Sequence, residues 1–227
     1  MILKKEKPIV IAEVGVNHNG SISKAKKLIE HASRCGADVV KFQYYKTELL
    51  VSKSHYIKNS DYNPKKVFNM LKKYELNFNQ FKELKKYAKR KKIIFTATPF
   101  DKLSVRELDK LNVPFFKLAS SDINNFPLIE EILKKKKHLI FSTGRSSIKE
   151  IEKTINFLKR KKFKKFSILY CVSSYPTQLE ELNLNAIKYF KSKFKCKVGF
   201  SDHTSGVEAS IAAVAIGADY IEKHLTL

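Results

Sequence analysis

Polar side chains, most of them ionisable or carrying a hydroxyl, stand at the ends of a series of short, apolar, β-branched runs in this sequence. Buried strands ordinarily end in apolar residues instead. Several of the polar side chains occur in pairs two residues apart, such as Glu222 with His224. Residues two apart in a strand project from the same face, so each pair can act on one ligand. The closing residues are Glu13, Lys41, Gln43, Thr96, Thr98, Lys117, Ser142, Ser201, His203, Glu222 and His224.

One subset of these residues has the chemistry of an anion site. Lysine and hydroxyl groups donate charge-assisted hydrogen bonds to phosphate oxygens. The sequence therefore predicts a phosphate-binding set consisting of Thr98, Lys117, Ser120, Ser121, Ser142 and Ser201.

Two histidines close the last two apolar runs, His203 and His224. Neutral imidazoles are ligands for divalent transition metals, so the pair predicts a metal site; two structural histidines are the alternative. His18 lies in a short polar turn after the first run, where it can shape a loop beside the site.

The elements that must position these side chains are strands alternating with helices. Helix start and stop signals stand between the runs: Asn125 before Pro127, Ser147 three residues before Glu150, and Gly36 and Gly217 at helix ends. We expect strands over residues 8–13, 39–43, 93–98, 115–118, 139–142, 166–170, 198–201 and 220–224. We expect helices over residues 23–35, 78–91, 104–111, 127–135, 147–161, 184–194 and 207–216.

Continuous apolar strands that alternate with helices indicate a parallel sheet covered by helices. Eight such units predict a (β/α)8 TIM barrel of the α/β class, with the polar strand ends meeting at its C-terminal mouth; an open doubly wound sheet is the alternative.

The excursion over residues 44–77 is long and rich in tyrosine, and we expect it to cover part of the site or to be a solvent-exposed loop with one short helix near residues 64–74.

The composition restricts the class of protein. The chain has 227 residues, 45 Lys and Arg against 22 Asp and Glu, and a net charge of +23. The basic residues are mainly lysines beside helical patterns, which favours solvated helix faces over anion steering or a nucleic-acid groove. No apolar run reaches a membrane span of about 18 residues, and the three cysteines show no C-x-x-C spacing, so we expect a cytoplasmic protein with reduced thiols.

The motif series resembles that of the sialic acid synthase family, which includes the N-acetylneuraminate, legionaminate and pseudaminate synthases. The resemblance runs in order over nearly the whole chain. It rests on IAEVGVNHNG at 11–20, VKFQ at 40–43, TPF at 98–100, FKLAS at 116–120, STG at 142–144, CVSSYP at 171–176, GFSDHT at 199–204 and EKH at 222–224.

The resemblance implies condensation of phosphoenolpyruvate with N-acetylmannosamine or a related 2-acetamido sugar, yielding a nonulosonic acid and phosphate. It implies Mn²⁺, or Mg²⁺ or Co²⁺ in its place, on His203 and His224. Glu222 would orient or deprotonate the attacking water. Phosphoenolpyruvate would be held by Thr98, Lys117, Ser120, Ser142 and Ser201, and the remaining site residues would be Glu13, Lys41, Gln43, Ser173 and Tyr175.

The chain departs from the family pattern at two places. Val172 replaces a threonine that commonly follows the cysteine of the sixth strand, and the sequence stops at Leu227. We therefore expect residues 1–227 to form a single catalytic barrel domain, truncated before the eighth helix and the family's antifreeze-like C-terminal domain. The full-length protein is expected to be a homodimer. Without that helix, we expect Ile9, Ile11 and Tyr220 or Ile221 to be exposed on an apolar strip.

Two other functions compete with the condensation. A barrel aldolase or lyase would use Lys41 or Lys117 as a Schiff-base amine. A basic protein associated with nucleic acid would use the lysines on its surface.

Overall fold

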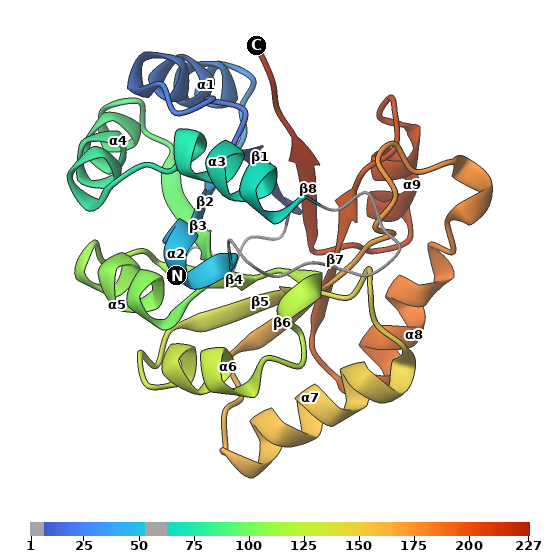
Figure 1. Ribbon diagram of the computed structural model, residues 1–227. Coiled ribbons are helices and arrows are strands. Elements are labelled where there is room, and N and C mark those ends of the chain that lie inside the picture. The colour runs from blue at the N-terminus through green and yellow to red at the C-terminus, as the bar shows by residue number, and fades with distance from the viewer. Residues whose placement is uncertain (1–6, 53–62) are drawn as a thin grey trace.

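The computed structural model describes residues 7–52 and 63–227. Eight parallel strands curl into a barrel, with helices around its outside (Figure 1). The strands are β1 (Ile9–Gly15), β2 (Val39–Tyr44), β3 (Ile94–Pro99), β4 (Phe115–Leu118), β5 (His138–Ser142), β6 (Phe166–Tyr170), β7 (Lys197–Asp202) and β8 (Tyr220–His224).

The sheet runs in the order β3-β2-β1-β8-β7-β6-β5-β4, so its two edges are strands that follow each other in the chain. Across this seam the Thr96 hydroxyl donates to the Phe115 carbonyl oxygen over 2.8 Å. The barrel is therefore nearly closed. The predicted TIM-barrel class is confirmed, and the open doubly wound alternative is wrong.

The predicted helices begin and end within two residues of the bounds expected from the sequence. Ser147 Oγ accepts from the Glu150 amide at the start of α7 (3.3 Å), and Gly36 and Gly217 have positive φ angles of 76° and 99°. The helices are α1 (Ile22–Arg34), α2 (Thr47–Leu50), α3 (Pro64–Tyr74), α4 (Phe78–Arg90), α5 (Lys102–Lys110), α6 (Phe126–Leu133), α7 (Ile148–Arg160), α8 (Asn185–Phe194) and α9 (Glu208–Ala215), with 3₁₀ turns η2 (Ser120–Asp122) and η3 (Leu179–Glu181).

Apolar side chains fill two separate spaces. One lies between the sheet and the helices, where Phe42 and Phe81 pack. The other fills the floor of the barrel and consists of Ile9, Ile11, Val39, Phe115, Ile140, Leu169 and Tyr220.

The expectation of an exposed strip on β1 and β8 is wrong. Ile9, Ile11 and Tyr220 are at most 2% exposed because they point into the barrel, and Ile221 is 6% exposed. Alternation along β1 exposes Val10 (41%) on the outside instead.

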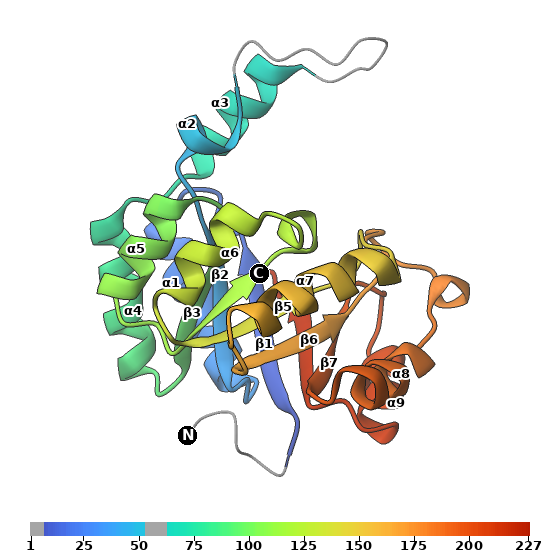
Figure 2. The same ribbon diagram turned by 90° about the horizontal axis from the view of Figure 1, so that it is seen from below.

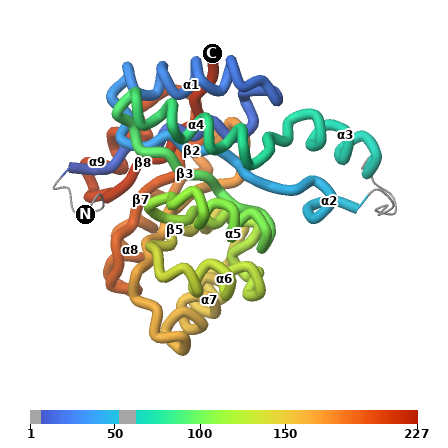
Figure 3. Tube along the Cα trace, turned by 90° about the vertical axis from the view of Figure 1, so that its left-hand side faces the viewer, coloured from blue at the N-terminus to red at the C-terminus, as the bar shows by residue number. Residues whose placement is uncertain are grey.

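The excursion after β2 stands out from the barrel (Figures 2 and 3). Glu75 Oε2 accepts from the Thr47 amide (3.0 Å), which ties α2 to the end of α3. None of the described residues from 46 to 76 lines the pocket at the barrel mouth, so the expected cover is absent from that part of the excursion. Tyr56 and Tyr62, which belong to the predicted segment, lie outside the described residues.

Many surface lysines pair with carboxylates on neighbouring helices. Lys161 lies 2.7 Å from Glu130, and Lys137 lies 2.8 Å from Asp109. These pairs agree with solvated helix faces as the origin of the high charge. Among the described residues, no helix combines the length and apolar character that a membrane crossing needs.

Candidate active site

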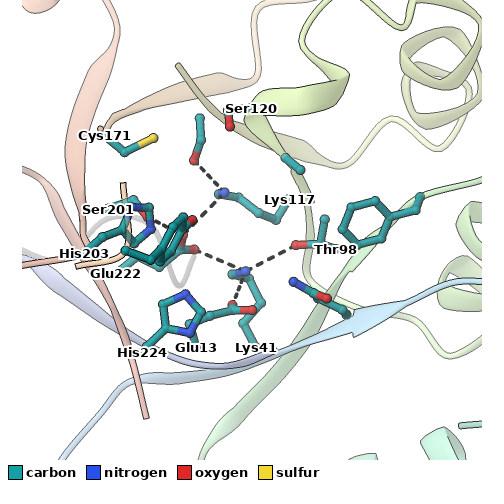
Figure 4. Close-up of a pocket in the computed structure, with 15 residues that line it drawn as sticks. Glu13, Lys41, Thr98, Lys117, Ser120, Cys171, Ser201, His203, Glu222 and His224 are labelled. Carbon is teal, nitrogen blue, oxygen red and sulfur yellow. Dashed lines mark hydrogen bonds and ion pairs between the residues drawn. The ribbon is translucent and has the colours of Figure 1, made fainter. Parts of the chain in front are cut away.

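A pocket of about 220 Å³ opens at the carboxyl ends of the strands, inside the barrel (Figure 4). Parallel strands all end at this mouth, so side chains that are distant in sequence meet there. Its lining is Glu13, Lys41, Gln43, Thr98, Phe100, Lys117, Ala119, Ser120, Ser142, Cys171, Tyr175, Ser201, His203, Glu222 and His224.

Two lysines and two glutamates form a buried charge cluster at the base of this pocket. Lys41 Nζ forms an ion pair with Glu13 and lies 3.5 Å from Glu222 Oε2, and Lys117 Nζ lies 3.4 Å from Glu222 Oε1. All four residues are at most 5% exposed. The two positive and two negative charges balance, which is the condition for burying them together.

The pKa values within this cluster diverge. Burial tends to raise the pKa of Glu222, but Lys117, Lys41 and the Ser201 hydroxyl together lower it to about 2. Burial raises the pKa of Glu13, and Lys41 offsets this only in part. Glu222 therefore stays ionised and is suited to orienting a ligand, whereas Glu13 is the carboxyl group better able to exchange a proton.

The two lysines diverge in the same way. Burial lowers the pKa of Lys117, and Glu222 offsets this only in part. Burial also acts on Lys41, but Glu13 and Glu222 on either side raise its pKa overall.

Each ammonium group has a hydroxyl partner. Lys117 Nζ donates to Ser142 Oγ over 2.7 Å, and Lys41 Nζ donates to Thr98 Oγ1 over 3.2 Å. Ser201 Oγ donates to Glu222 Oε1 over 2.8 Å. The ammonium and hydroxyl donors of this surface can bind an anion with several oxygens, such as a phosphate.

Two predicted serines lie away from this surface. Ser173 is outside the pocket lining, and its hydroxyl lies 3.4 Å from that of Ser120. Ser121 is exposed and donates to Asp122 Oδ2 over 3.4 Å, so its assignment to the phosphate set is wrong. It lies in the η2 turn, where consecutive side chains diverge rather than alternate.

The two predicted metal ligands lie together at the mouth, with ring centroids 5.7 Å apart. His203 Nδ1 lies 2.7 Å from the Val172 carbonyl oxygen, to which it can only donate, so the lone pair of the neutral ring is on Nε2, which lies 3.3 Å from Ser201 Oγ. The Tyr175 ring packs over His203 at 4.1 Å between centroids. The arrangement fits two imidazole donors of an open metal site.

The turn after β1 fixes the end of β8. A register shift between Glu13 and Gly15 bends β1 at the mouth. The Leu225 amide donates to the Glu13 carbonyl oxygen (2.8 Å), and Asn17 Nδ2 donates to the Leu225 carbonyl oxygen (2.9 Å). These bonds anchor the chain directly after His224.

His18 is buried in the same turn and accepts from the Gly20 amide at Nδ1 (3.0 Å). Its role is to hold the turn rather than to line the pocket. Sequence reasoning missed three pocket residues, Phe100, Ala119 and Cys171, although all three belong to the family-like motifs, because an apolar residue or lone thiol carries no chemical signal of a site.

The model of the NeuB family matches residues 28–227 of this chain. The chain belongs to the NeuB family. The predicted resemblance to sialic acid synthases is thereby confirmed at the level of the family.

The chain is similar to two named synthases and to one uncharacterised protein. The chain is 43% identical to N,N'-diacetyllegionaminic acid synthase of Campylobacter jejuni, over 98% of this chain and 68% of the relative. It is 38% identical to N-acetylneuraminate-9-phosphate synthase of Homo sapiens, over 96% of this chain and 62% of the relative. It is 46% identical to an uncharacterised protein of Methanocaldococcus jannaschii, over 99% of this chain and 64% of the relative.

Solved structures agree with this assignment. The sialic acid synthetase of Leptospira borgpetersenii, crystallised with citrate, superposes with a TM-score of 0.87 and 38% identity, over 97% of this chain and 74% of that structure. A 3-deoxy-D-arabino-heptulosonate 7-phosphate synthase of Thermotoga maritima matches at 13% identity with a TM-score of 0.71, which is a likeness of fold alone. The predicted enzyme class, a synthase-type transferase, is the class of the named relatives; the chain spans about two thirds of their length.

Proposed function

We propose that the chain carries the catalytic barrel of a nonulosonic acid synthase, which condenses phosphoenolpyruvate with a 2-acetamido sugar. The observation that carries this proposal is the buried Lys41–Glu13–Glu222–Lys117 cluster, surrounded by hydroxyls at the mouth of a NeuB-family barrel. Phosphoenolpyruvate has two anionic groups, and the pocket has two buried ammonium groups with hydroxyls beside them.

In the proposed reaction, C3 of phosphoenolpyruvate forms a bond to the aldehyde carbon of the open-chain sugar, water adds to C2, and phosphate leaves to give the 2-keto acid. Lys117 and Ser142 bind the phosphate, and the ionised Glu222 orients the water. Glu13, whose pKa is raised, is the group that exchanges a proton with the reacting oxygen. Thr98, Ser120 and Ser201 complete the anion site, Gln43 and Tyr175 face the sugar, and Ser173 supports Ser120 from outside the pocket lining.

The donor set supports a divalent metal on His203 and His224, with Mn²⁺ as the proposed ion and Mg²⁺ or Co²⁺ as alternatives. Among the described residues these two imidazoles have no third metal-binding side chain grouped with them, so water or substrate oxygens would complete the coordination. When bound, such an ion supplies Lewis acidity to a carbonyl oxygen.

The metal assignment predicts that His203→Ala and His224→Ala each lower Mn²⁺ affinity by at least about tenfold, because each removes one of two protein ligands. Titration of Mn²⁺ by its effect on water proton relaxation measures this directly. Far-UV circular dichroism serves as the control for folding. Unchanged Mn²⁺ affinity in both variants would exclude this site.

The decisive test of the function is phosphate release from phosphoenolpyruvate in the presence of Mn²⁺. We would assay N-acetylmannosamine, its 6-phosphate and a 2,4-diacetamido sugar, each with and without a chelator. We expect release that depends on one of these sugars and on the metal. Failure of every sugar, with a folded and phosphoenolpyruvate-binding protein, would overturn the proposal. We further propose a cytoplasmic location, in accord with the free thiols of Cys35, Cys171 and Cys196, and we propose that the protein forms a homodimer.

One observation favours a second candidate. Burial lowers the pKa of Lys117, which is the property that a Schiff-base amine requires. Lys41, held between two carboxylates, lacks this property. Borohydride reduction in the presence of a keto acid, followed by mass spectrometry, distinguishes the two reactions: a covalent adduct on Lys117 identifies an aldolase, and its absence supports the condensation.

A further inference from the structure

A second cavity, of about 500 Å³, lies outside the barrel between the beginnings of α7 and α8. Its lining includes the buried apolar residues Ile151 and Phe190, and the half-buried ring of Tyr170, at the end of β6, lies 6.5 Å from the Phe190 ring between centroids. Its rim is polar. We call this cavity the α7–α8 groove; it is lined by Thr143, Gly144, Ser146, Ile148, Ile151, Tyr170, Cys171, Asn183, Asn185, Ala186, Tyr189 and Phe190.

Two polar groups of the α7–α8 groove, Ser146 Oγ and Tyr170 Oη, have unused hydrogen-bonding capacity. Ser146 Oγ is buried and has no hydrogen-bond partner in the part of the chain that the structure describes. Tyr170 Oη accepts from the Asn183 amide over 2.8 Å and keeps its own proton to donate. A buried hydroxyl without a partner costs stability, so rotation of the Ser146 side chain to bring Oγ to a bound ligand would remove an existing penalty.

The groove contrasts with the rest of the molecule in its charge. The chain carries a net charge of +23, and the catalytic pocket is lined by lysines, glutamates and histidines. None of the described residues that line the groove carries a charge. Its recognition groups are hydroxyls, amides and two tyrosine rings, which select against a phosphate or carboxylate and suit an uncharged polar ligand.

The groove and the catalytic pocket share a wall. Cys171 lines both cavities, and Thr143 and Gly144 directly follow Ser142 of the pocket. This wall is tightly packed, because a Cβ atom on Gly144 would lie 2.5 Å from Ser173 Oγ and 2.7 Å from Cys171 Sγ. A molecule in the groove therefore rests against the strand ends that present the catalytic side chains.

We propose that the α7–α8 groove binds an uncharged sugar, at a site separate from the catalytic pocket. A pyranose has faces of C–H groups, which pack on tyrosine rings and on the buried apolar residues, and a rim of hydroxyls, which match Ser146, Asn183 and Asn185. The cavity volume is within the range of roughly 300–1,000 Å³ typical of small-molecule sites. This inference goes beyond the proposed condensation and does not depend on it, because binding alone tests it.

The experiment is an NMR titration of the ¹⁵N-labelled chain with N-acetylmannosamine, with chelator present and phosphoenolpyruvate omitted. We expect saturable shifts of the amide signals of Ser146, Asn183, Asn185 and Tyr189. The double variant Asn183→Ala/Asn185→Ala should weaken this binding about tenfold, since it removes two rim amides. Asn156→Ala, an exposed asparagine elsewhere on α7, is the matched control and should bind normally.

Two results would overturn the proposal: shifts confined to the catalytic pocket, or equal binding of N-acetylmannosamine 6-phosphate at the groove. Ala186→Trp provides an independent test by filling the groove from α8, and it should abolish the groove shifts. Phosphate release measured in the same variants separates the two proposals. If the unmodified chain releases phosphate from phosphoenolpyruvate but shows no sugar binding at the groove, the sugar site is refuted and the proposed condensation is unaffected.

Discussion

Lys41 and Lys117 have the same side chain and the same burial, yet their neighbours give them different chemistry. Lys41 lies between two carboxylates and is held as a fixed cation. Lys117 has one carboxylate and one hydroxyl partner, and burial lowers its pKa. An entering anion therefore gains most from Lys117, whose charge is the less satisfied of the two.

This difference predicts the effect of Lys117→Met. The variant should weaken phosphoenolpyruvate binding by about 10- to 100-fold, because a desolvated hydrogen bond to a charged group contributes about 1.5–3 kcal/mol. Isothermal titration calorimetry measures the loss. Lys149→Met, an exposed lysine on α7, is the matched control. An unchanged dissociation constant in Lys117→Met would show that the anion binds elsewhere.

A second residue-scale prediction concerns pH. Burial lowers the pKa of His18 from 6.5 to about 4, so the folded state keeps this imidazole neutral while the unfolded state protonates it. His18 therefore contributes its full stability above pH 6.5, and this contribution is lost as the pH falls towards 4, by about 1.4 kcal/mol per pH unit at most. Urea unfolding at pH 7 and pH 5 measures the change.

His18→Asn is the control for this pH effect, because its amide oxygen can accept from the Gly20 amide without titrating. We expect a shallower loss of stability with acidification in this variant. The loss of stability that His138 causes on acidification would remain in this variant, since burial lowers the pKa of His138 to about 4 as well. An identical slope in the variant and the parent would contradict the assignment.

The site residues could be predicted from the sequence because strands alternate with a period of two and end at one mouth. The partners of each residue could not be predicted in this way. Nothing in the sequence distinguishes Lys41 from Lys117, since Glu13 and Glu222 approach them from β1 and β8, far away in the chain. Ser121 was misplaced because a 3₁₀ turn interrupts the alternation after β4.

At the scale of the elements, β7 and β8 depend on one glycine. A Cβ atom on Gly199 would lie 2.5 Å from both Cβ and the carbonyl oxygen of Tyr220. The Tyr220 ring fills the barrel floor, where its hydroxyl lies 3.2 Å from Ser167 Oγ. Ser167 Oγ in turn lies 2.8 Å from His138 Nε2, so a polar chain crosses the floor on β8, β6 and β5.

Gly199→Ala should therefore destabilise the barrel by about 2 kcal/mol, because overpacking at a rigid backbone contact forces the strands apart. Denaturant unfolding measures the difference. Gly36→Asn is the control, since Gly36 has nothing within 4 Å of its added Cβ and asparagine tolerates its positive φ. Equal losses in both variants would indicate a general sensitivity of glycines rather than this contact.

The elements were predicted well wherever capping residues bounded a periodic pattern, as at Ser147 and Asn125. The facing of β1 was predicted incorrectly. Its residues are apolar on both faces, so the alternation that reveals the inward side is missing between Ile9 and Ala12. Only the closed barrel, with side chains from all strands in its floor, determines which face is internal.

At the scale of the whole molecule, α9 and the residue before it present exposed apolar side chains. Val207, just before the helix, and Ile211 and Val214 within it are spaced four and three residues apart and are 56%, 64% and 40% exposed. That spacing places them on one face. A continuous apolar face of this kind favours association.

We predict that the 227-residue chain self-associates through this α9 face and that Ile211→Lys shifts it towards the monomer. Sedimentation velocity over a range of concentrations measures the change. Leu103→Lys is the matched control, because Leu103 is an exposed apolar residue on α5 (42%). A chain that remains monomeric at every concentration, or an equal response in both variants, would contradict the prediction.

The seam between β3 and β4 has a consequence for how a bound anion acts on the barrel. These strands are the two free edges of the sheet, and Thr98 stands on one edge while Lys117 stands on the other. Local opening at the seam separates these two side chains, whereas Glu13, Lys41 and Glu222 remain on strands paired on both sides. A substrate that contacts both Thr98 and Lys117 therefore links the two edges of the sheet. We expect its binding to slow deuterium uptake along β3 and β4, so that occupancy of the pocket and closure of the barrel are coupled.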